Sequence, residues 1–209
     1  MEKIERAAIE WGAAEFTLPG QTLCGDLCVV KNFDDGWLMG AVDGLGHGQH
    51  AAAAARAAIE VLEGHPEESL TSLVYRCHAR LRSTRGAVMS LASFNARHST
   101  MSWISVGNVA GVLLHRQAMR PRGESLLLRP GVVGAELPTL YAPVLPVARG
   151  DVLILATDGV RSGFGDYADL DEPPQSIADR ILARYKRGTD DALVVVARFV
   201  NNGNEIHPR

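Results

Sequence analysis

Two apolar segments separated by a polar turn constrain this chain most, because together they predict a hairpin with a defined register. The segments 26–31 and 37–42 flank the sequence Asn-Phe-Asp-Asp-Gly at 32–36, which is typical of a β-hairpin loop. In such an antiparallel pair, the first residue of one segment faces residue 42 or 43 of the other. The spacing therefore predicts that the carboxylates of Asp26 and Asp43 lie side by side at the open end of the hairpin.

A glycine-rich turn follows the second strand of that hairpin. Its sequence, Asp-Gly-Leu-Gly-His-Gly at 43–48, leads into an alanine-rich segment over 49–62 that predicts a helix. Glycine permits positive φ and close backbone approach, so the turn can expose Asp43 to a ligand. A cap for the helix and a metal or phosphate site are both consistent with this turn, and taken alone it favours the cap.

The rest of the chain predicts an α+β fold. Further helices are expected over 66–82, where apolar residues repeat with helical spacing, and over 175–186, after two prolines. Strands are expected over 7–16, 87–94, 101–106, 110–115, 125–128, 151–157 and 193–200. Pro and Gly residues over 130–146 predict an irregular surface segment, and 201–209 a frayed tail. Since no repeat or linker divides the chain, we expect one domain over residues 1–209.

Composition narrows the class of protein. The 209 residues are 46% hydrophobic and 22% charged, as in ordinary globular domains, and a formal net charge of −3 gives no reason to expect nucleic acid. The charged N-terminus at 1–6 lacks the apolar core of a signal peptide, and no apolar run approaches the ~18 residues of a membrane helix. The three cysteines, Cys24, Cys28 and Cys77, make no disulfide framework. We therefore expect a cytoplasmic protein with buried, reduced thiols and no membrane partner.

The second half of the chain repeats the geometry of the first. Asp158 follows one apolar strand, and Asp190 and Asp191 precede the last one. If these strands pair antiparallel, the end of the first lies beside the start of the second. Stacking the two hairpin-like units would bring Asp158 and Asp190 to Asp26 and Asp43. Each acid singly is explained as a turn or cap residue, but all four at compatible strand ends favour a shared site.

Such a cluster predicts divalent cations, because four neighbouring carboxylates repel one another if no cation is bound. A donor set of oxygen atoms without Cys or His selects Mg²⁺ or Mn²⁺ over zinc. Two such ions about 4 Å apart can activate a bridging water and hold a phosphoryl oxygen.

Five short motifs occur in a characteristic order: Cys-Gly-Asp at 24–26, Asp-Gly-Leu-Gly-His-Gly at 43–48, Ser-Val-Gly-Asn at 105–108, Ala-Thr-Asp-Gly-Val at 156–160 and Asp-Asp-Ala at 190–192. As an ordered set they resemble metal-dependent serine/threonine phosphatases of the PP2C (PPM) type, in the bacterial branch that includes SpoIIE, RsbU and RsbX. The resemblance covers residues from about 20 to 200. It implies an α-β-β-α sandwich, in which two stacked antiparallel sheets are flanked by helices.

The resemblance also implies roles for individual residues. Asp43 would bridge two Mn²⁺ or Mg²⁺ ions, and the Gly44 carbonyl would bind one of them directly or through water. Asp158 and Asp190 would hold the other ion, and Asp26 matches a ligand of a metal or of its bound water. Asp43, Asp158 and Asp190 would thus be catalytic through a metal-activated water.

Other positions of the motifs match less closely. Asp191 corresponds to a supporting position beside the metal ligands, and Gly107 with Asn108 to a structural turn next to the site. Leu45 occupies the place where animal members carry a histidine proposed as general acid, so we interpret His47 as structural. No arginine matches the one that binds phosphate in some relatives.

A catalytic domain without a sensor domain or membrane segment resembles the RsbX type most. The expected reaction is hydrolysis of phosphoserine or phosphothreonine on stressosome scaffold proteins with a STAS domain. One alternative is a PPM phosphatase acting on an anti-sigma-factor antagonist. Less favoured alternatives are a two-metal nucleotide phosphodiesterase and a catalytically dead binding module of the same fold.

Overall fold

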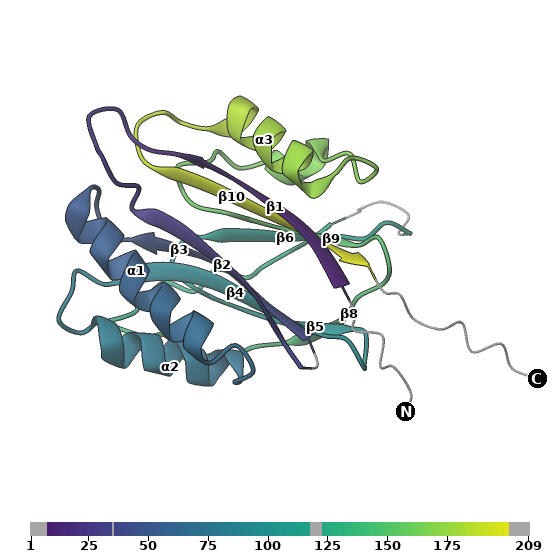
Figure 1. Cartoon of the computed structure of the whole chain (residues 1–209), viewed down its shortest axis with the longest axis horizontal. Helices are drawn as coiled ribbons and strands as arrows, with labels where there is room; N and C mark the ends of the chain where they lie inside the picture. The colour runs from purple at the N-terminus through teal and green to yellow at the C-terminus, as the bar shows by residue number, and fades with distance from the viewer. Residues whose placement is uncertain (1–7, 35, 118–122, 201–209) are drawn as a thin grey trace, which may run out of the picture.

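The computed structural model describes residues 8–34, 36–117 and 123–200. Two five-stranded antiparallel sheets lie face to face, with helices on both outer sides (Figure 1). The elements are β1 (Ala8–Phe16), β2 (Asp26–Phe33), β3 (Gly36–Gly44), α1 (Gln49–Gly64), α2 (Leu70–Leu81), β4 (Ala87–Asn95), β5 (Thr100–Val106), β6 (Ala110–Leu114), β7 (Gly123–Ser125), β8 (Val144–Pro146), β9 (Val152–Ala156), the short 3-10 helix η1 (Phe164–Tyr167), α3 (Pro174–Tyr185) and β10 (Ala192–Val200).

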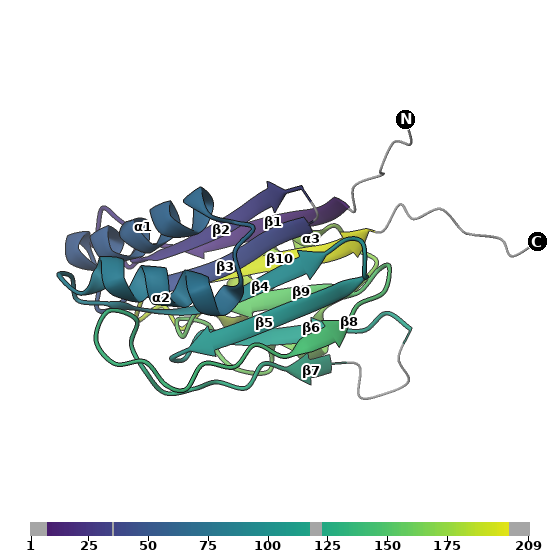
Figure 2. The ribbon, with the colours of Figure 1, turned by 90° about the horizontal axis from the view of Figure 1, so that it is seen from below.

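The layers follow the predicted α-β-β-α sandwich, which the structure confirms. One sheet has the strand order β1-β10-β9-β6-β7 and the other β2-β3-β4-β5-β8. Helix α3 packs on β1 and β10 of the first sheet, and α1 and α2 cover the second sheet (Figures 1 and 2). Since both faces of each sheet are covered, the central strands are almost wholly apolar, and every residue of β9 is buried.

Apolar side chains fill the space between the two sheets. Phe94 of β4 and Phe199 of β10 stack there with ring centroids 6.3 Å apart. Under α1 the core is made of small side chains, since Ala51, Ala54 and Ala58 are fully buried. Small residues on this face let the helix approach the second sheet closely, which matters for the turn that precedes α1.

The register of the first hairpin is the one that the sequence predicts. Strands β2 and β3 pair antiparallel with Asp26 opposite Asp43. The expected five-residue loop is shorter, because pairing continues to Phe33 opposite Gly36. Strands β9 and β10 are also antiparallel neighbours, with Ala156 opposite Val194. The end of β9 therefore lies beside the start of β10, as the paired acids require.

Several predicted boundaries are wrong. The second helix begins at Leu70 and not at 66, because a turn closes from Glu68 N to His65 O and the Ser69 hydroxyl caps the helix by accepting from Ser72 N. The strand expected over 125–128 is displaced to Gly123–Ser125, where it pairs with β6. The irregular segment over 130–146 ends in the short strand β8, which pairs with β5.

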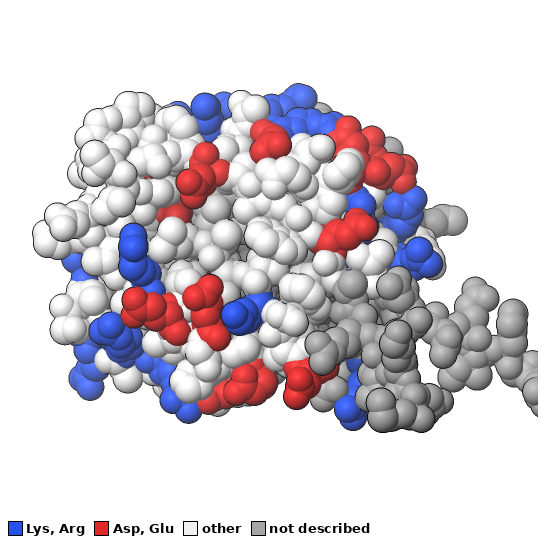
Figure 3. All heavy atoms as spheres, viewed as in Figure 1, with Lys and Arg blue, Asp and Glu red and all other residues white. Residues whose placement is uncertain are grey.

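Other predictions have mixed outcomes. Cys77 is buried, but Cys24 and Cys28 are only half-buried, and all three thiols are free. The charged N-terminus at 1–6 and the tail at 201–209 lie outside the described residues. None of the helices in the described ranges combines the length and the apolar composition that a membrane span requires. On the face shown in Figure 3, basic and acidic side chains are interspersed.

The contact between the sheets gives a first test. Phe199→Ala removes a side chain that is 1% exposed, and we expect the free energy of unfolding to fall by about 3–5 kcal/mol. Tyr75→Ala truncates an aromatic side chain that is 59% exposed and should change it by less than about 0.5 kcal/mol. Urea unfolding of both variants measures this. Similar losses in the two would contradict the assignment of Phe199 to the inter-sheet core.

Candidate active site

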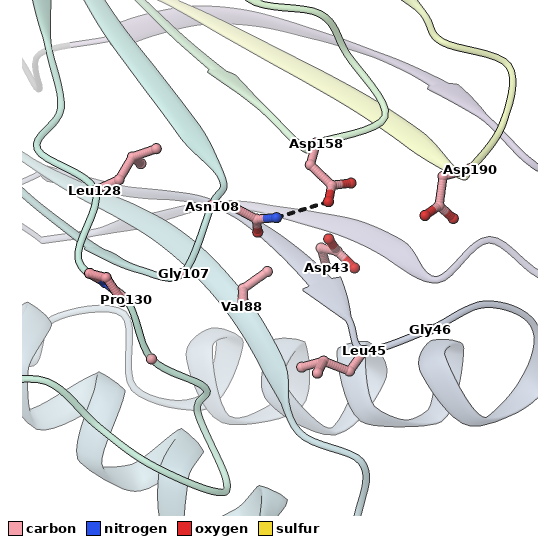
Figure 4. A pocket seen from close by; sticks show the side chains of 11 residues that line it. Asp43, Leu45, Gly46, Val88, Gly107, Asn108, Leu128, Pro130, Asp158 and Asp190 are labelled. Atoms are coloured by element: carbon pink, nitrogen blue, oxygen red, sulfur yellow. Dashed lines mark hydrogen bonds between the residues drawn. The ribbon is translucent and has the colours of Figure 1, made fainter.

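A pocket of about 570 Å³ opens at the ends of strands from both sheets. Its acidic side is formed by Asp43 from β3, Asp158 after β9 and Asp190 before β10, whose side chains point toward one another (Figure 4). Residues far apart in the sequence thus converge on one cavity. The other lining residues are Leu45, Gly46, Val88, Gly107, Asn108, Leu128, Pro130 and Gly131.

The pocket has a second, apolar side. Leu128 and Pro130 lie across the cavity from the acids, and Val88 lies between (Figure 4). Among the described residues that line the pocket none is His, Lys, Arg, Tyr or Cys, and the ionisable side chains are the three aspartates. His47 is exposed and outside the lining set. The pocket can therefore hold a cation near its acids while apolar side chains limit water on the opposite wall.

Asp26 lies beside Asp43 but behind the pocket surface. Its residue is only 2% exposed, and one carboxylate oxygen, Oδ2, accepts a hydrogen bond of 2.7 Å from the Thr157 hydroxyl. The same Thr157 oxygen accepts a bond of 2.8 Å from Leu193 N. Thr157 belongs to the first sheet's side of the interface and Asp26 to the second, so this bond joins the two sheets directly at the site.

Burial and mutual repulsion disfavour the charged forms of the two paired acids. The pKa of Asp43 is raised from 3.8 to about 9, first by burial and then by the charges of Asp26, Asp158 and Asp190. The pKa of Asp26 is raised to about 7, first by burial and then by the neighbouring acids, against the opposing effect of the Thr157 hydrogen bond. Without a cation, these carboxyl groups are held in an unfavourable environment for charge.

Asp191 has a different role from its neighbour Asp190. Its buried carboxylate accepts bonds from Leu18 N at 2.7 Å and from Gly25 N at 2.6 Å. Both of its oxygens are thus used to hold the connection between β1 and β2. Asp191 does not line the pocket, and it positions the segment that carries Asp26.

Two glycines of the motifs are required by close backbone approach. A Cβ on Gly44 would lie 2.0 Å from the Ala51 carbonyl oxygen, and one on Gly159 would lie 1.9 Å from that of Asp191. Any side chain at either place would force the backbone apart. Gly44 thus lets α1 pack against the turn after Asp43, and Gly159 lets the turn after Asp158 pack against the start of β10.

Asp158 is fixed from two directions. Asn108 Nδ2 donates to its Oδ2 at 2.8 Å (Figure 4), and Arg187 Nε donates to its backbone oxygen at 2.9 Å. Arg187 N also donates to the Gly159 oxygen at 2.8 Å. Groups that hold an acid in this manner restrict its orientation, as second-layer partners of metal ligands do.

The donor chemistry of the site fits a hard divalent cation. Carboxylate oxygens are the ligands that Mg²⁺ and Mn²⁺ prefer, and the raised pKa values of Asp26 and Asp43 show how much their charges lack compensation. Within the described ranges, however, no three His, Cys, Asp or Glu side chains are already gathered closely enough to form a metal site. The acids surround the pocket and do not close on one point.

The predicted site residues therefore fall into groups. Asp43, Asp158, Asp190, Gly107 and Asn108 line one pocket. Asp26, Gly44 and Asp191 lie outside its lining, with Asp26 directly beside Asp43.

Sequence reasoning missed Thr157 and Arg187 as partners of the acids. Thr157 had a signal, because it is a hydroxyl residue that directly follows the aliphatic strand β9. Arg187 had none, since its contact with Asp158 depends on how α3 leads back to β10.

Comparison with known proteins identifies the family. The family model described as Stage II sporulation protein E (SpoIIE) matches residues 34–200. The chain belongs to the SpoIIE family of PP2C-type phosphatases. The phosphoserine phosphatase RsbX of Bacillus subtilis (strain 168) is 29% identical over 143 residues, which cover 68% of this chain and 69% of RsbX.

Solved structures agree with this assignment. A structure concerning the bacterial stressosome as a modular system for control of secondary messenger signaling matches with a TM-score of 0.82 and 29% identity, over 91% of this chain and 100% of its own. RsbX in complex with magnesium also matches with a TM-score of 0.82, at 22% identity, over 95% of this chain and 98% of its own. The second likeness establishes the fold, and the predicted PP2C-like architecture is confirmed.

The raised pKa values predict how stability depends on pH. Because the folded-state pKa of Asp43 exceeds its unfolded value, folding binds protons, and metal-free stability falls as pH rises from about 4 toward 9. Asp43→Asn removes this effect, so in EDTA at pH 9 we expect it to be more stable than wild type by at least about 1 kcal/mol. Urea unfolding at pH 5, 7 and 9 tests this, with Asp34→Asn at the exposed far end of the hairpin as control. A wild-type stability that does not decline with pH would contradict it.

The hydrogen bonds of Thr157 give a second prediction. Thr157→Val keeps the side chain's shape but leaves Asp26 Oδ2 and Leu193 N without their buried partner. We expect a loss of about 1–3 kcal/mol in the free energy of unfolding, whereas Thr139→Val, at an exposed position, should be neutral. Equal stabilities of the two variants would show that the link between the sheets does not depend on this hydroxyl.

Proposed function

We propose that this protein is a metal-dependent phosphatase that hydrolyses phosphoserine or phosphothreonine on STAS-domain scaffold proteins of a stressosome. The observation that carries the proposal is the convergence of Asp43, Asp158 and Asp190 on one pocket, with Asp26 behind them. Support for the substrate comes from the likeness to a phosphoserine phosphatase and to a chain of a stressosome-related structure.

In this proposal the carboxylates of Asp26, Asp43, Asp158 and Asp190, with the Gly44 carbonyl, hold Mn²⁺ or Mg²⁺, with two ions expected. Bound there, the ions supply a water of lowered pKa and positive charge against the phosphoryl oxygens. Asn108 keeps the Asp158 carboxylate in one orientation by donating to Oδ2. Thr157 does the same for Asp26, and Asp191 holds the backbone before Asp26 through Gly25 N.

The residues that line the pocket determine which group can protonate the leaving alkoxide. Leu45 occupies the position of the histidine in animal relatives, and it contributes an apolar wall. Among the described lining residues only the aspartates titrate. Because carboxylates that hold a metal ion are ionised, the serine or threonine alkoxide takes its proton from solvent, and not from His47, which is exposed outside the pocket.

The test uses phosphorylated STAS-domain scaffold protein as substrate, with Mn²⁺, Mg²⁺ or EDTA. We expect phosphate release only with a divalent ion, and a decrease in kcat/KM of at least about 100-fold in Asp43→Asn and of about 10–100-fold in Asn108→Ala. Asp34→Asn, in the same hairpin as Asp43 but at its exposed end, should retain wild-type activity. Equal release by Asp43→Asn would refute the proposed site.

The alternatives give distinct results in parallel assays. Faster release from a phosphorylated anti-sigma-factor antagonist than from the scaffold would assign the protein to that substrate. Hydrolysis of bis(p-nitrophenyl) phosphate without hydrolysis of the monoester would indicate a phosphodiesterase. Absence of Mn²⁺ binding by calorimetry, together with absence of hydrolysis, would indicate a binding module.

A further inference from the structure

The turn between α2 and β4 brings an arginine to the edge of the acidic pocket. Leu45 N donates to the Gly86 oxygen at 3.1 Å, which ties this turn to the glycine-rich turn after Asp43. Within the α2–β4 turn, the Thr84 hydroxyl donates to the Leu81 oxygen at 2.8 Å and accepts from Gly86 N at 3.0 Å. Arg85 lies between these fixed points, so its backbone is well positioned beside the pocket.

The guanidinium group of Arg85 lies over Gly46. A methyl group built on Gly46 would be 3.0 Å from Arg85 Nη1. Gly46 has a φ of +91° and is itself a lining residue of the pocket together with Asp43 and Leu45. The missing side chain at Gly46 thus leaves room for a cation at the pocket's edge.

The charge of Arg85 is not used by the fold. Two arginines of α2 form ion pairs, Arg76 with Glu68 at 2.7 Å and Arg80 with Glu60 at 3.5 Å. Arg85 is exposed and makes no ion pair or hydrogen bond with any residue of the described ranges. An arginine without a partner, placed next to an acidic pocket, is available to a ligand.

A phosphorylated substrate needs a cationic side chain beside the acidic pocket. A phosphate monoester carries close to two negative charges and must approach three aspartates. A guanidinium presents two parallel N–H donors that match two phosphoryl oxygens, which a lysine does not do. Because the Arg85 side chain is exposed, binding must also offset the loss of its rotamer freedom, which charge-assisted hydrogen bonds to two phosphoryl oxygens can do.

We propose that Arg85 binds the phosphoryl group of the substrate through two of its non-bridging oxygens. This proposal rests on the phosphatase function proposed above and assigns the phosphate-binding cation that the motifs left without a match. Arg187 also lies near the acids, but its Nε and backbone N are bound to the Asp158–Gly159 turn. Arg187 braces that turn, whereas Arg85 is free to contact substrate.

The experiment compares Arg85→Ala, Arg85→Lys and Arg187→Ala with Arg82→Ala, an exposed arginine three residues earlier. Inorganic phosphate is the probe, measured both as an inhibitor of p-nitrophenyl phosphate hydrolysis and directly by calorimetry on the Mn²⁺-loaded protein. In Arg85→Ala we expect the phosphate inhibition constant and the KM for the phosphoprotein to rise about 10–100-fold, as loss of one such interaction implies. Arg85→Lys should fall between Arg85→Ala and wild type, and Arg82→Ala should match wild type.

Mn²⁺ affinity, measured by calorimetry without phosphate, separates phosphate binding from damage to the metal site. It should be the same in Arg85→Ala and wild type. Unchanged phosphate affinity in Arg85→Ala, a parallel loss of Mn²⁺ affinity, or a larger phosphate effect in Arg187→Ala would each overturn the proposal. If the wild type hydrolyses no phosphoprotein, the proposed function fails, while direct phosphate binding that depends on Arg85 still decides the role of this residue.

Discussion

The site depends on two hydrogen-bonded links between the sheets. Asp191, directly before β10, accepts from the backbone N–H groups of Leu18 and Gly25, and Thr157, directly after β9, donates to Asp26. All of these groups lie at the end of the sandwich where the strands carrying the acids meet. Buried and charge-assisted bonds of this kind are strong and directional. They therefore set the spacing of Asp26 and Asp43 relative to the acids of the first sheet.

That spacing has an electrostatic consequence. The fold buries these carboxylates and holds them close together, so burial first and mutual repulsion second raise the pKa values of Asp26 and Asp43. The acidic cluster does not stabilise the metal-free protein, because burying unpaired charges destabilises the folded state. The unfavourable environment becomes useful when a divalent cation displaces the protons, because binding then relieves the repulsion. Stability and metal affinity are thus opposed at the same residues.

The two walls of the pocket also differ in the residues that they carry. Asp43 lies in β3, and Asp158 and Asp190 lie within two residues of β9 and β10, while Gly46, Asn108 and the apolar residues Leu128 and Pro130 come from the loops. Rigid elements suit groups whose geometry must not vary, and turns suit groups that meet a substrate. Arg85 belongs to the second class, since its turn is held by Leu45 N and by Thr84 while its side chain is exposed.

Three features can be predicted from the amino-acid sequence: the hairpin register that pairs Asp26 with Asp43, the alternation of strands and helices, and the PP2C-like sandwich that the ordered motifs indicate. These follow from period-two patterning, turn residues and glycine, which are local properties of the chain. Three other features become visible in the folded molecule: Asp191 holds backbone N–H groups and does not line the pocket, Thr157 links the sheets, and Arg85 reaches Gly46. Those contacts join segments with no local signal for each other, because they depend on how two sheets and their connecting turns pack in space.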